Sequence, residues 1–407
     1  MVLKCLRNEA ETGFPGGDKF MSYAFKEPVA DAPCGDGVRP EGHGPKAIGI
    51  LRRNPEIWVA IVLWLASNLF VIGIAKLVTS KGGASYHSAA DLCRWDCGWY
   101  GSVLEGDYDR APRHDGTANW PFHPAFPLTA YPFRHWLKFS LPMSMVLASK
   151  TALLFAIYAF IVLVREQGDS TADHFRAGSL VAFNPYLIYA HAGYAEPLYF
   201  ALTAFAFILA SRRRWISSGI TGAFLSLTRF VGFLFVFSYA IMSLREGGWR
   251  KYDQTKLIGL LLCPLGTALF MLYMYHLTGD ALVQLHIQVA WGKTPGSPFD
   301  VLWMCLTSHH WPRVWGVMVL AGFAASAWLC KLGKPEFGVY LALAIFIPLS
   351  ASYWAIARYI WWQPPFLYAI YYTLKRHAAW WPIYTAFAAG LSAFMVLSWF
   401  TGHNFVV

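Results

Sequence analysis

The sequence predicts an all-α polytopic membrane protein, and three observations lead to that fold class. Charged residues make up only 14% of the 407 residues and hydrophobic residues 56%, whereas a soluble domain carries about 25% charged residues. Apolar runs of about 17 to 25 residues recur along the chain, and each is long enough to cross a bilayer as a helix. The net charge of +10 comes from short basic clusters between these runs, which is typical of cytoplasmic anchoring and does not favour a nucleic-acid partner.

The predicted spans alternate with polar connections along the chain. They cover about residues 57–78, 141–164, 177–194, 197–211, 216–243, 257–276, 314–330, 337–354, 360–374 and 379–400. Two connections are long, about residues 79–140 and 277–313. Residues 1–54 are polar, rich in Gly and Pro, and lack the apolar core of a signal peptide. We therefore expect a polar cytoplasmic tail over residues 1–54 and a single transmembrane domain over residues 55–407.

Basic residues set the expected orientation, because they collect on the cytoplasmic side of a membrane. Lys46, Arg52 and Arg53 precede the first span, which places the 79–140 connection outside. The alternation continues as far as Arg214. If residues 216–243 formed one crossing, every later basic cluster would lie outside, against the rule.

The segment 216–243 is therefore expected to be a re-entrant helix pair. It is too long for an ordinary span and too short for two, which need about 40 residues, and Arg229 stands where the bilayer midplane would be. We expect the segment to turn near Thr228 and Arg229 and to leave on the side from which it entered, with protein or a watery cavity around the irregular backbone. The outer face then carries both long connections together with Tyr194, Glu196 and Arg358.

The first outer connection opens with an acidic and aromatic stretch, "DLCRWDCGWYGSVLEGDYDR" (residues 91–110). Asp96 lies between Trp95 and Trp99, and a carboxylate beside aromatic surface near the membrane boundary suits a general base. In the alternative interpretation, the stretch is an interfacial helix that Asp91 caps, with Asp96 solvated and the indole rings serving as anchors.

Three other charged residues of the outer face each have two interpretations. Arg229 at mid-membrane depth needs an anionic partner, which is either a lipid phosphate or Glu196 in a structural ion pair. Arg358, in "YWAIARYIWW", is either a second phosphate contact or an interfacial anchor. Glu196 precedes Pro197 at the start of an apolar run, which is also a common helix-capping signal.

The cysteines and histidines do not indicate a metal site. Cys93 and Cys97 could pair in an oxidising compartment, a question that their spacing alone does not decide. The histidines of the outer face, His123 among them, lack the spacing of metal ligands. The sequence also has no glycine-rich phosphate loop and no dinucleotide fingerprint. We expect neither a metal nor a cofactor.

Four segments resemble a known family in their motifs and in their order. "RWDCGWYGSVLEGDYD" with "WPFHPAFPLTAYPF" (residues 120–133) resembles the WDxxWY…FFPLYP pattern of PIG-V-type mannosyltransferases, which include the second mannosyltransferase of GPI-anchor assembly and its prokaryotic relatives. "FNPYLIYAHAGYAEPLYFAL" (residues 183–202) resembles the FNPAS…AxYSESLFAL segment of that family, and "LTRFVG" (residues 227–232) resembles (T/A)R(S/P)xG. The matches cover roughly residues 60–370.

The resemblance implies a GT-C fold and an inverting, metal-independent glycosyltransferase. The donor would be a polyprenyl-phosphate sugar, with mannose favoured, used at the extracytoplasmic face to glycosylate a lipid-linked or glycan acceptor among membrane lipids. Its acidic residue of the first outer loop corresponds to Asp96, with Asp91 beside it. Fixed cations can stabilise the leaving phosphate, a role that suits Arg229 and Arg358. The expected pocket comprises Trp95, Trp99, Tyr100, His123, Tyr194, Glu196, Gln284 and Trp291.

Departures from the family pattern and two rival functions keep the specificity open. Pro197 stands where the family has Ser, and His123 interrupts the FFPLYP motif, so the acceptor and the sugar are not fixed. A transporter or lipid flippase would also use broken helices and intramembrane charge, but would show two related halves. A non-catalytic subunit would keep the motifs as vestiges. The sequence has no Asn-x-Ser/Thr site, which favours a bacterial inner membrane over the endoplasmic reticulum of a eukaryote.

Overall fold

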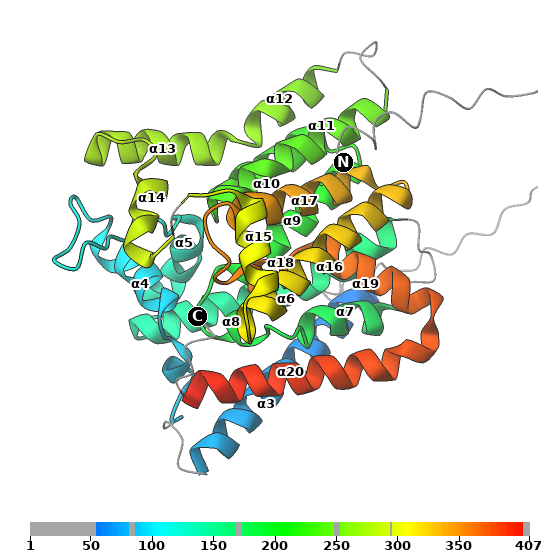
Figure 1. Cartoon of the computed structure of the whole chain (residues 1–407), viewed down its shortest axis with the longest axis horizontal. Helices are drawn as coiled ribbons and strands as arrows, with labels where there is room; N and C mark the ends of the chain where they lie inside the picture. The colour runs from blue at the N-terminus through cyan, green and yellow to red at the C-terminus, as the bar shows by residue number, and fades with distance from the viewer. Residues whose placement is uncertain (1–53, 81–85, 168–172, 248–252, 294, 402–407) are drawn as a thin grey trace, which may run out of the picture. The chain divides into compact units, whose positions relative to one another are not determined.

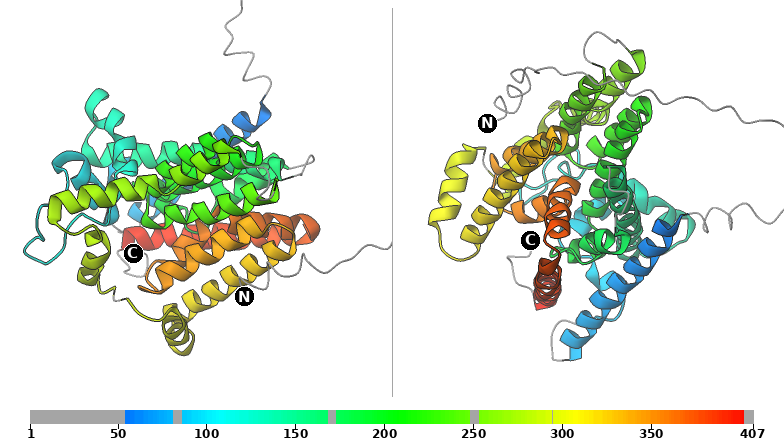
Figure 2. Two further views of the ribbon diagram at one scale, coloured as in Figure 1. Left: turned by 90° about the horizontal axis from the view of Figure 1, so that it is seen from above. Right: turned by 90° about the vertical axis from the view of Figure 1, so that its right-hand side faces the viewer.

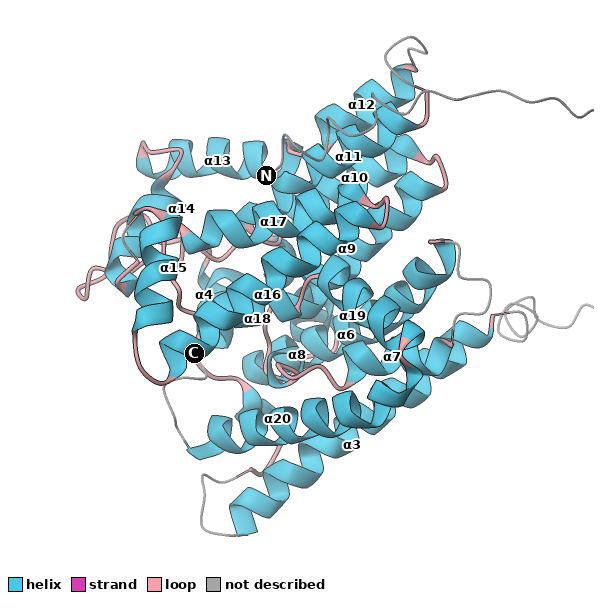
Figure 3. Ribbon diagram, turned by 45° about the vertical axis from the view of Figure 1, so that its right-hand side comes forward, coloured by secondary structure: helices cyan, strands magenta, loops and turns pink. Residues whose placement is uncertain are grey.

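The computed structural model describes residues 54–80, 86–167, 173–247, 253–293 and 295–401. Within these ranges every regular element is a helix and none is a strand (Figure 3). The all-α class is therefore confirmed. The predicted tail lies outside the described residues, apart from Asn54.

Among the described residues, four helices are long and apolar enough to cross a membrane. They are α3 (Pro55–Ser80), α6 (Leu141–Glu166), α16 (Trp311–Lys331) and the span Ala378–Thr401, most of which is α20 (Trp381–Thr401). A fifth candidate is bent by 40° between α12 (Gln254–Leu262) and α13 (Leu265–Thr278). Pro264 lies at the bend, where its missing N–H interrupts the helical hydrogen bonds. The described residues thus form a multi-pass membrane protein.

The expected span 177–194 is not one helix, which corrects the prediction. The chain forms α7 (His174–Ala182), turns, and resumes in the short α8 (Ile188–His191). Asn184 precedes Pro185, and a residue before proline disfavours the helical conformation. The Asn184 side chain stabilises the turn, since it accepts a hydrogen bond from the Tyr186 N–H (2.8 Å) and donates one to the Trp361 carbonyl (2.8 Å).

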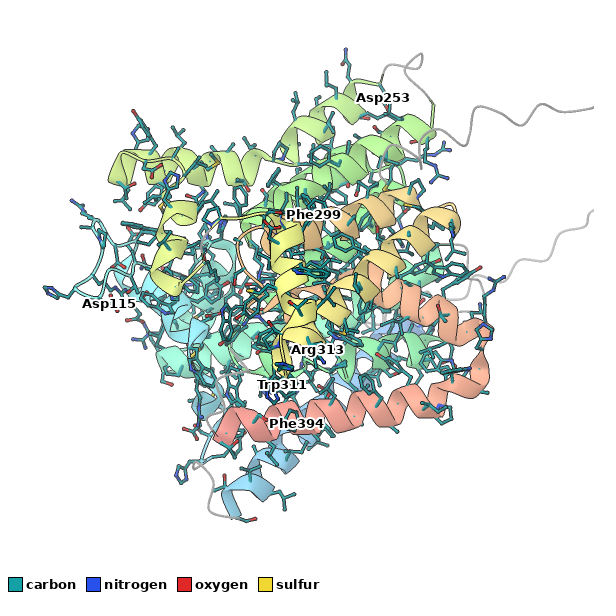
Figure 4. The ribbon with its side chains drawn as sticks, viewed as in Figure 1. Asp115, Asp253, Phe299, Trp311, Arg313 and Phe394 are labelled. Carbon is teal, nitrogen blue, oxygen red and sulfur yellow. A yellow bond between two sulfur atoms is a disulfide. The ribbon has the colours of Figure 1, made fainter. Side chains whose placement is uncertain are left out.

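The core forms where α9 (Glu196–Ser211) lies between α6, α10 (Trp215–Ser226) and α17 (Pro335–Leu349) (Figures 1 and 2). Phe207 contacts Phe337 edge-on, with ring centroids 4.6 Å apart, and the Tyr199 and Tyr340 hydroxyls lie 2.6 Å apart. α16 packs on α17 and on α15 (Pro298–Thr307). On its other side, Trp311 of α16 stacks on Phe394 of α20, with centroids 6.0 Å apart (Figure 4).

The predicted helix pair is present as a hairpin. Helix α10 ends at Ser226, and the chain reverses through residues 227–229 and η3 (Phe230–Leu234) into α11 (Phe235–Arg245). The two ends meet again, because Arg213 before α10 forms an ion pair of 2.8 Å with Glu246 after α11. Gly232 lies against the Leu225 carbonyl, where a Cβ would clash. Arg229 is therefore at the tip of the hairpin, and the ends form its base.

Both long connections contain helices and meet each other. The first holds η1 (Ala89–Leu92), α4 (Asp96–Gly106), α5 (Ala125–Tyr131) and η2 (Pro132–Trp136), and the second holds α14 (Val283–His286), η4 (Ile287–Trp291) and α15. Trp99 of α4 contacts Trp291 of η4, with ring centroids 5.5 Å apart. Figure 1 shows α4, α5 and α14 gathered at one end of the bundle.

Candidate active site

Four charged side chains from four separate segments form one buried cluster, the charge chain Asp96–Arg358–Glu196–Arg229. The Asp96 Oδ2 lies 3.4 Å from an Arg358 Nη2. Glu196 Oε1 lies 3.1 Å from the Arg358 Nε and 2.6 Å from the Arg229 Nη2. The side chain of Glu196 is 1% exposed, that of Arg358 6%, that of Arg229 17% and that of Asp96 27%. Asp96 is thus the most accessible member.

The local sequence explains how each segment supplies its residue. Glu196 begins α9 with Pro197 after it, so the carboxylate lies at the positive end of the helix and the proline fits the first turn. Arg229 extends from the break between α10 and η3. Arg358 lies in the short α18 (Ile356–Trp361), which follows Ala355 at φ 63°. Asp96 is the first residue of α4.

Tyrosine rings enclose the two guanidinium groups. The Arg358 Cζ lies 4.7 Å from the ring centroid of Tyr189 and 5.4 Å from that of Tyr194. The Tyr359 ring lies 5.2 Å from the Arg358 Cζ and 4.7 Å from the Arg229 Cζ. Such cation–π contacts stabilise cations that have lost their water. The tyrosine rings therefore stabilise the two buried guanidinium groups.

Tyr359 is the group whose ionisation the cluster changes most clearly. Burial raises its pKa, but the positive charges of Lys293, Arg358 and Arg229 together lower the pKa of Tyr359 to about 8. The same three cations, set against the carboxylates of Asp96 and Glu196, give the cluster an excess of positive charge. That balance favours an anionic ligand.

Several buried polar atoms of the pocket have no hydrogen-bond partner among the described residues. They include the Nε atoms of Arg229 and Arg358 and the Glu196 Oε2. The 3.1 Å contact between the Arg358 Nε and Glu196 is consequently ionic and lacks hydrogen-bond geometry. Buried polar groups are nearly always satisfied, so free guanidinium donors are what a site for phosphate oxygens requires.

Two pocket residues predicted from the sequence share that property. The His123 Nδ1 and both side-chain polar atoms of Gln284 are buried without a partner within the described part of the chain. Burial lowers the pKa of His123 to about 3, against a hydrogen bond to the Ser226 backbone that raises it. Its imidazole is therefore neutral at pH 7 and lies against Phe270, with ring centroids 4.5 Å apart.

Asp91 does not join the charge chain. Its Oδ2 accepts hydrogen bonds from the backbone N–H groups of His87 (2.6 Å) and Ser88 (2.7 Å), which makes it part of a capping box at the start of η1. Two N–H donors stabilise the carboxylate in that position. The structure thus places Asp91 in a capping role, as the third residue of the 3₁₀-helix η1, after the N-cap Ser88.

The predicted aromatic residues pack in two places. Trp99 stacks on Phe122 with ring centroids 5.7 Å apart, and the Arg113 guanidinium lies 4.4 Å from its centroid. Tyr100 contacts the same Phe122 edge-on at 5.0 Å. Trp95 lies elsewhere, edge-on to Trp399 of α20 with centroids 4.4 Å apart.

Sequence reasoning missed three members of the pocket. Tyr189 and Tyr359 flank Arg358, and Lys293 acts electrostatically on Tyr359. Tyr359 follows Arg358 directly in the sequence, and this adjacency could have indicated that its ring lies near the guanidinium group. Tyr189 and Lys293 had none, because only the tertiary fold brings them near. Among the described residues, no three His, Cys, Asp or Glu side chains are grouped so that they could hold a metal ion.

Comparisons with known proteins found structural similarity alone. The sequence matches no protein-family model and no curated protein. The chain is similar to two solved structures of the oligosaccharyltransferase AglB from the archaeon Archaeoglobus fulgidus, one with an inhibitory peptide and a dolichol-phosphate and one tethered to an acceptor peptide. Both are 13% identical, with TM-scores of 0.45 and 0.44, and the match covers 88% of this chain. The chain spans about half the length of those relatives, 56% and 55%.

Proposed function

We propose that this protein is an integral membrane glycosyltransferase that moves a sugar from a polyprenyl-phosphate donor to a lipid or glycan acceptor, with inversion. The charge chain is the observation that carries the proposal. It joins Asp96 and Arg229, which belong to two of the family-like motifs, through Arg358 and Glu196. Both arginines have an Nε without a hydrogen-bond partner among the described residues. Mannose is the sugar favoured by the PIG-V-type resemblance.

The two arginines would hold the donor phosphate. A polyprenyl-phosphate sugar leaves as a lipid-linked phosphate, and preorganised cations in a site of low dielectric stabilise the charge that develops on it. The Nε atoms of Arg229 and Arg358 have no hydrogen-bond partner among the described residues. Glu196 forms ion pairs with both guanidinium groups. Lys293 adds a third positive charge nearby.

Asp96 would act as the general base. It takes the proton from an acceptor hydroxyl while that oxygen attacks the anomeric carbon, and the bond from this carbon to the phosphate oxygen breaks. The anomeric carbon is bonded directly to one oxygen of the donor phosphate, so the base and the phosphate site must belong to one site, on opposite sides of the sugar. Asp96 and Arg358 lie 3.4 Å apart in one cluster, which supports this proposal, and the bound donor sugar would separate them. A single displacement of this kind inverts the configuration.

The same proposal assigns the topology and the location. The hairpin base would face the cytoplasm and its tip the extracytoplasmic pocket, with residues 55–407 as one catalytic domain. A bacterial inner membrane with a periplasmic active site is the favoured location, and the lumen of the endoplasmic reticulum is the eukaryotic equivalent. His123, Gln284, Trp99 and Trp291 would contact the sugar or the acceptor.

The test is transfer of labelled mannose from polyprenyl-phosphate mannose by the purified protein. We expect Asp96→Asn to reduce the transfer rate by about a thousandfold, as for loss of a general base, with folding and donor binding retained. Asp115→Asn is the matched control, because Asp115 is exposed in the loop before α5 (Figure 4), where it accepts hydrogen bonds from Thr117. Lipid translocation without transfer would establish the flippase alternative instead.

A further inference from the structure

The residue before Asp96 has a backbone conformation that L-amino acids rarely adopt. Trp95 has φ 48° and ψ −113°. A side chain disfavours this region, and such a residue persists only where its surroundings enforce the conformation. The strain lies directly before the proposed base, which is the first residue of α4.

A disulfide spans the strained residue. Cys93 and Cys97 are bonded, with Cα atoms 5.3 Å apart, and enclose Arg94, Trp95 and Asp96. A bridge that closes so short a loop removes little entropy from the unfolded chain, so its contribution to global stability is small. Its effect is local, on the shape of the enclosed turn.

The bridge rests on the turn that leads to Glu196. Cys97 is fully buried, and its Sγ lies so close to Gly193 that a Cβ there would clash with it. Gly193 has φ 78°, which glycine accepts freely. The Tyr194 hydroxyl accepts a hydrogen bond from the Asp96 N–H (3.3 Å) and donates one to the Arg94 carbonyl (3.3 Å). These contacts fix the enclosed turn to the segment that carries Glu196.

We propose that the Cys93–Cys97 disulfide is a positioning device for the catalytic carboxylate. It holds Trp95 at positive φ. This backbone conformation directs the Asp96 side chain toward Arg358 and the proposed phosphate site. Without the bridge, Trp95 relaxes toward negative φ and the carboxylate moves away from its 3.4 Å contact. The inference rests on the proposed role of Asp96 and adds that transfer requires the oxidised bridge.

The first test removes the bridge with the least disturbance. Cys93→Ala breaks the disulfide and leaves the buried Cys97 sulfur in place. We expect kcat to fall by about 10- to 100-fold, because small misplacements of a catalytic group cost this much, with the KM for the donor and the thermal midpoint nearly unchanged. A variant with wild-type kcat overturns the proposal. A wild-type protein without any transfer would instead refute the proposed function.

A matched pair of variants isolates the strain at Trp95. Trp95→Ala and Trp95→Gly remove the same indole and its contact with Trp399, but only glycine tolerates positive φ without cost. With the bridge intact, the two variants should have equal kcat. In the Cys93→Ala background, the glycine variant should be about tenfold faster than the alanine variant. Equal losses in both would show that the bridge does not enforce the turn.

Hydrogen exchange gives a readout that needs no turnover. The Asp96 N–H is held by Tyr194 in the native turn, so Cys93→Ala should speed exchange in the peptide that contains residues 94–98. Adding Trp95→Gly should slow it again, whereas adding Trp95→Ala should not. Unchanged exchange in Cys93→Ala contradicts the positioning role even if the sugar donor has been chosen wrongly.

Discussion

The tip and the base of the α10–α11 hairpin both carry arginines and glutamates, yet the two regions are organised differently. At the base, Arg213 pairs with Glu246 and Arg245 pairs with Glu336, each at 2.8 Å. Glu246 also pairs with Lys256 at 3.6 Å, and the Arg213 side chain is 75% exposed. At the tip, two buried guanidinium groups share Glu196.

The base of the hairpin contains a cavity that charged side chains line. A cavity of about 380 Å³ is lined there by Arg213, Arg245, Lys334, Glu246, Glu336 and uncharged neighbours. Volume and charge together therefore do not distinguish a catalytic site. The burial of the cations does, because charges in a site of low dielectric interact more strongly with a ligand. The Arg358 and Arg229 side chains are 6% and 17% exposed, whereas the Arg213 side chain is 75% exposed.

The largest difference between the two regions should be in stability. Glu196→Gln leaves two buried cations without their shared acid, and removing one partner of a buried ion pair costs about 3–5 kcal/mol. Glu246→Gln at the base breaks the pairs with Arg213 and Lys256 near the surface, each worth about 0–1 kcal/mol. Denaturant unfolding of both variants in detergent measures the free energies. Equal losses of unfolding free energy in the two variants would contradict the claim that the ion pairs of the tip are more strongly shielded from solvent than those of the base.

The next difference should be in catalysis. Arg358→Gln removes a cation beside both Asp96 and the proposed phosphate, so kcat/KM for the donor should fall by about a hundredfold, as on losing one preorganised donor. Arg213→Gln at the base is the matched control and should change kcat/KM by less than about twofold. Steady-state transfer assays compare the two. A comparable loss of kcat/KM in Arg213→Gln would contradict the assignment of the tip, and not the base, as the catalytic region.

The smallest effect should be a dependence on pH that only the tip shows. The pKa of Tyr359 is lowered to about 8 by the surrounding cations. Above that pH the phenolate pairs with Arg229 and Arg358 and competes with the donor phosphate, whereas below it the phenol is neutral and the cations are free. The KM for the donor should therefore rise a few-fold between about pH 7 and 9, and Tyr359→Phe should remove the rise. A variant that keeps the rise assigns it to another group.

Local sequence signals predicted the helices and turns of the site better than they predicted which side chains contact one another there. The hairpin turn was predictable because a charge at mid-membrane depth and a segment of intermediate length permit few alternatives. Arg229 and Glu196 were paired in one of two interpretations, and the structure contains that ion pair. The second cation on Glu196 was not predictable, because Arg358 lies 162 residues further along the chain and no local pattern links them.

The failures have physical causes of the same kind. Asp91 and Asp96 lie in similar sequence surroundings, and only the backbone amides at the start of η1 show that Asp91 is a cap. The break at Asn184 was hidden by the apolar residues around it, although the following proline was a signal. The Cys93–Cys97 spacing left pairing open, and the fold supplies the answer by bending the chain around Trp95.

The central claim is that the tip of the hairpin binds the donor phosphate, and photo-crosslinking tests it most directly. A photoreactive polyprenyl-phosphate probe is added to the wild-type protein, to Arg229→Gln and to Arg213→Gln under identical conditions. We predict strong labelling of the wild type and of Arg213→Gln, competed by unlabelled polyprenyl phosphate, and little labelling of Arg229→Gln. Wild-type labelling of a folded Arg229→Gln would contradict the claim.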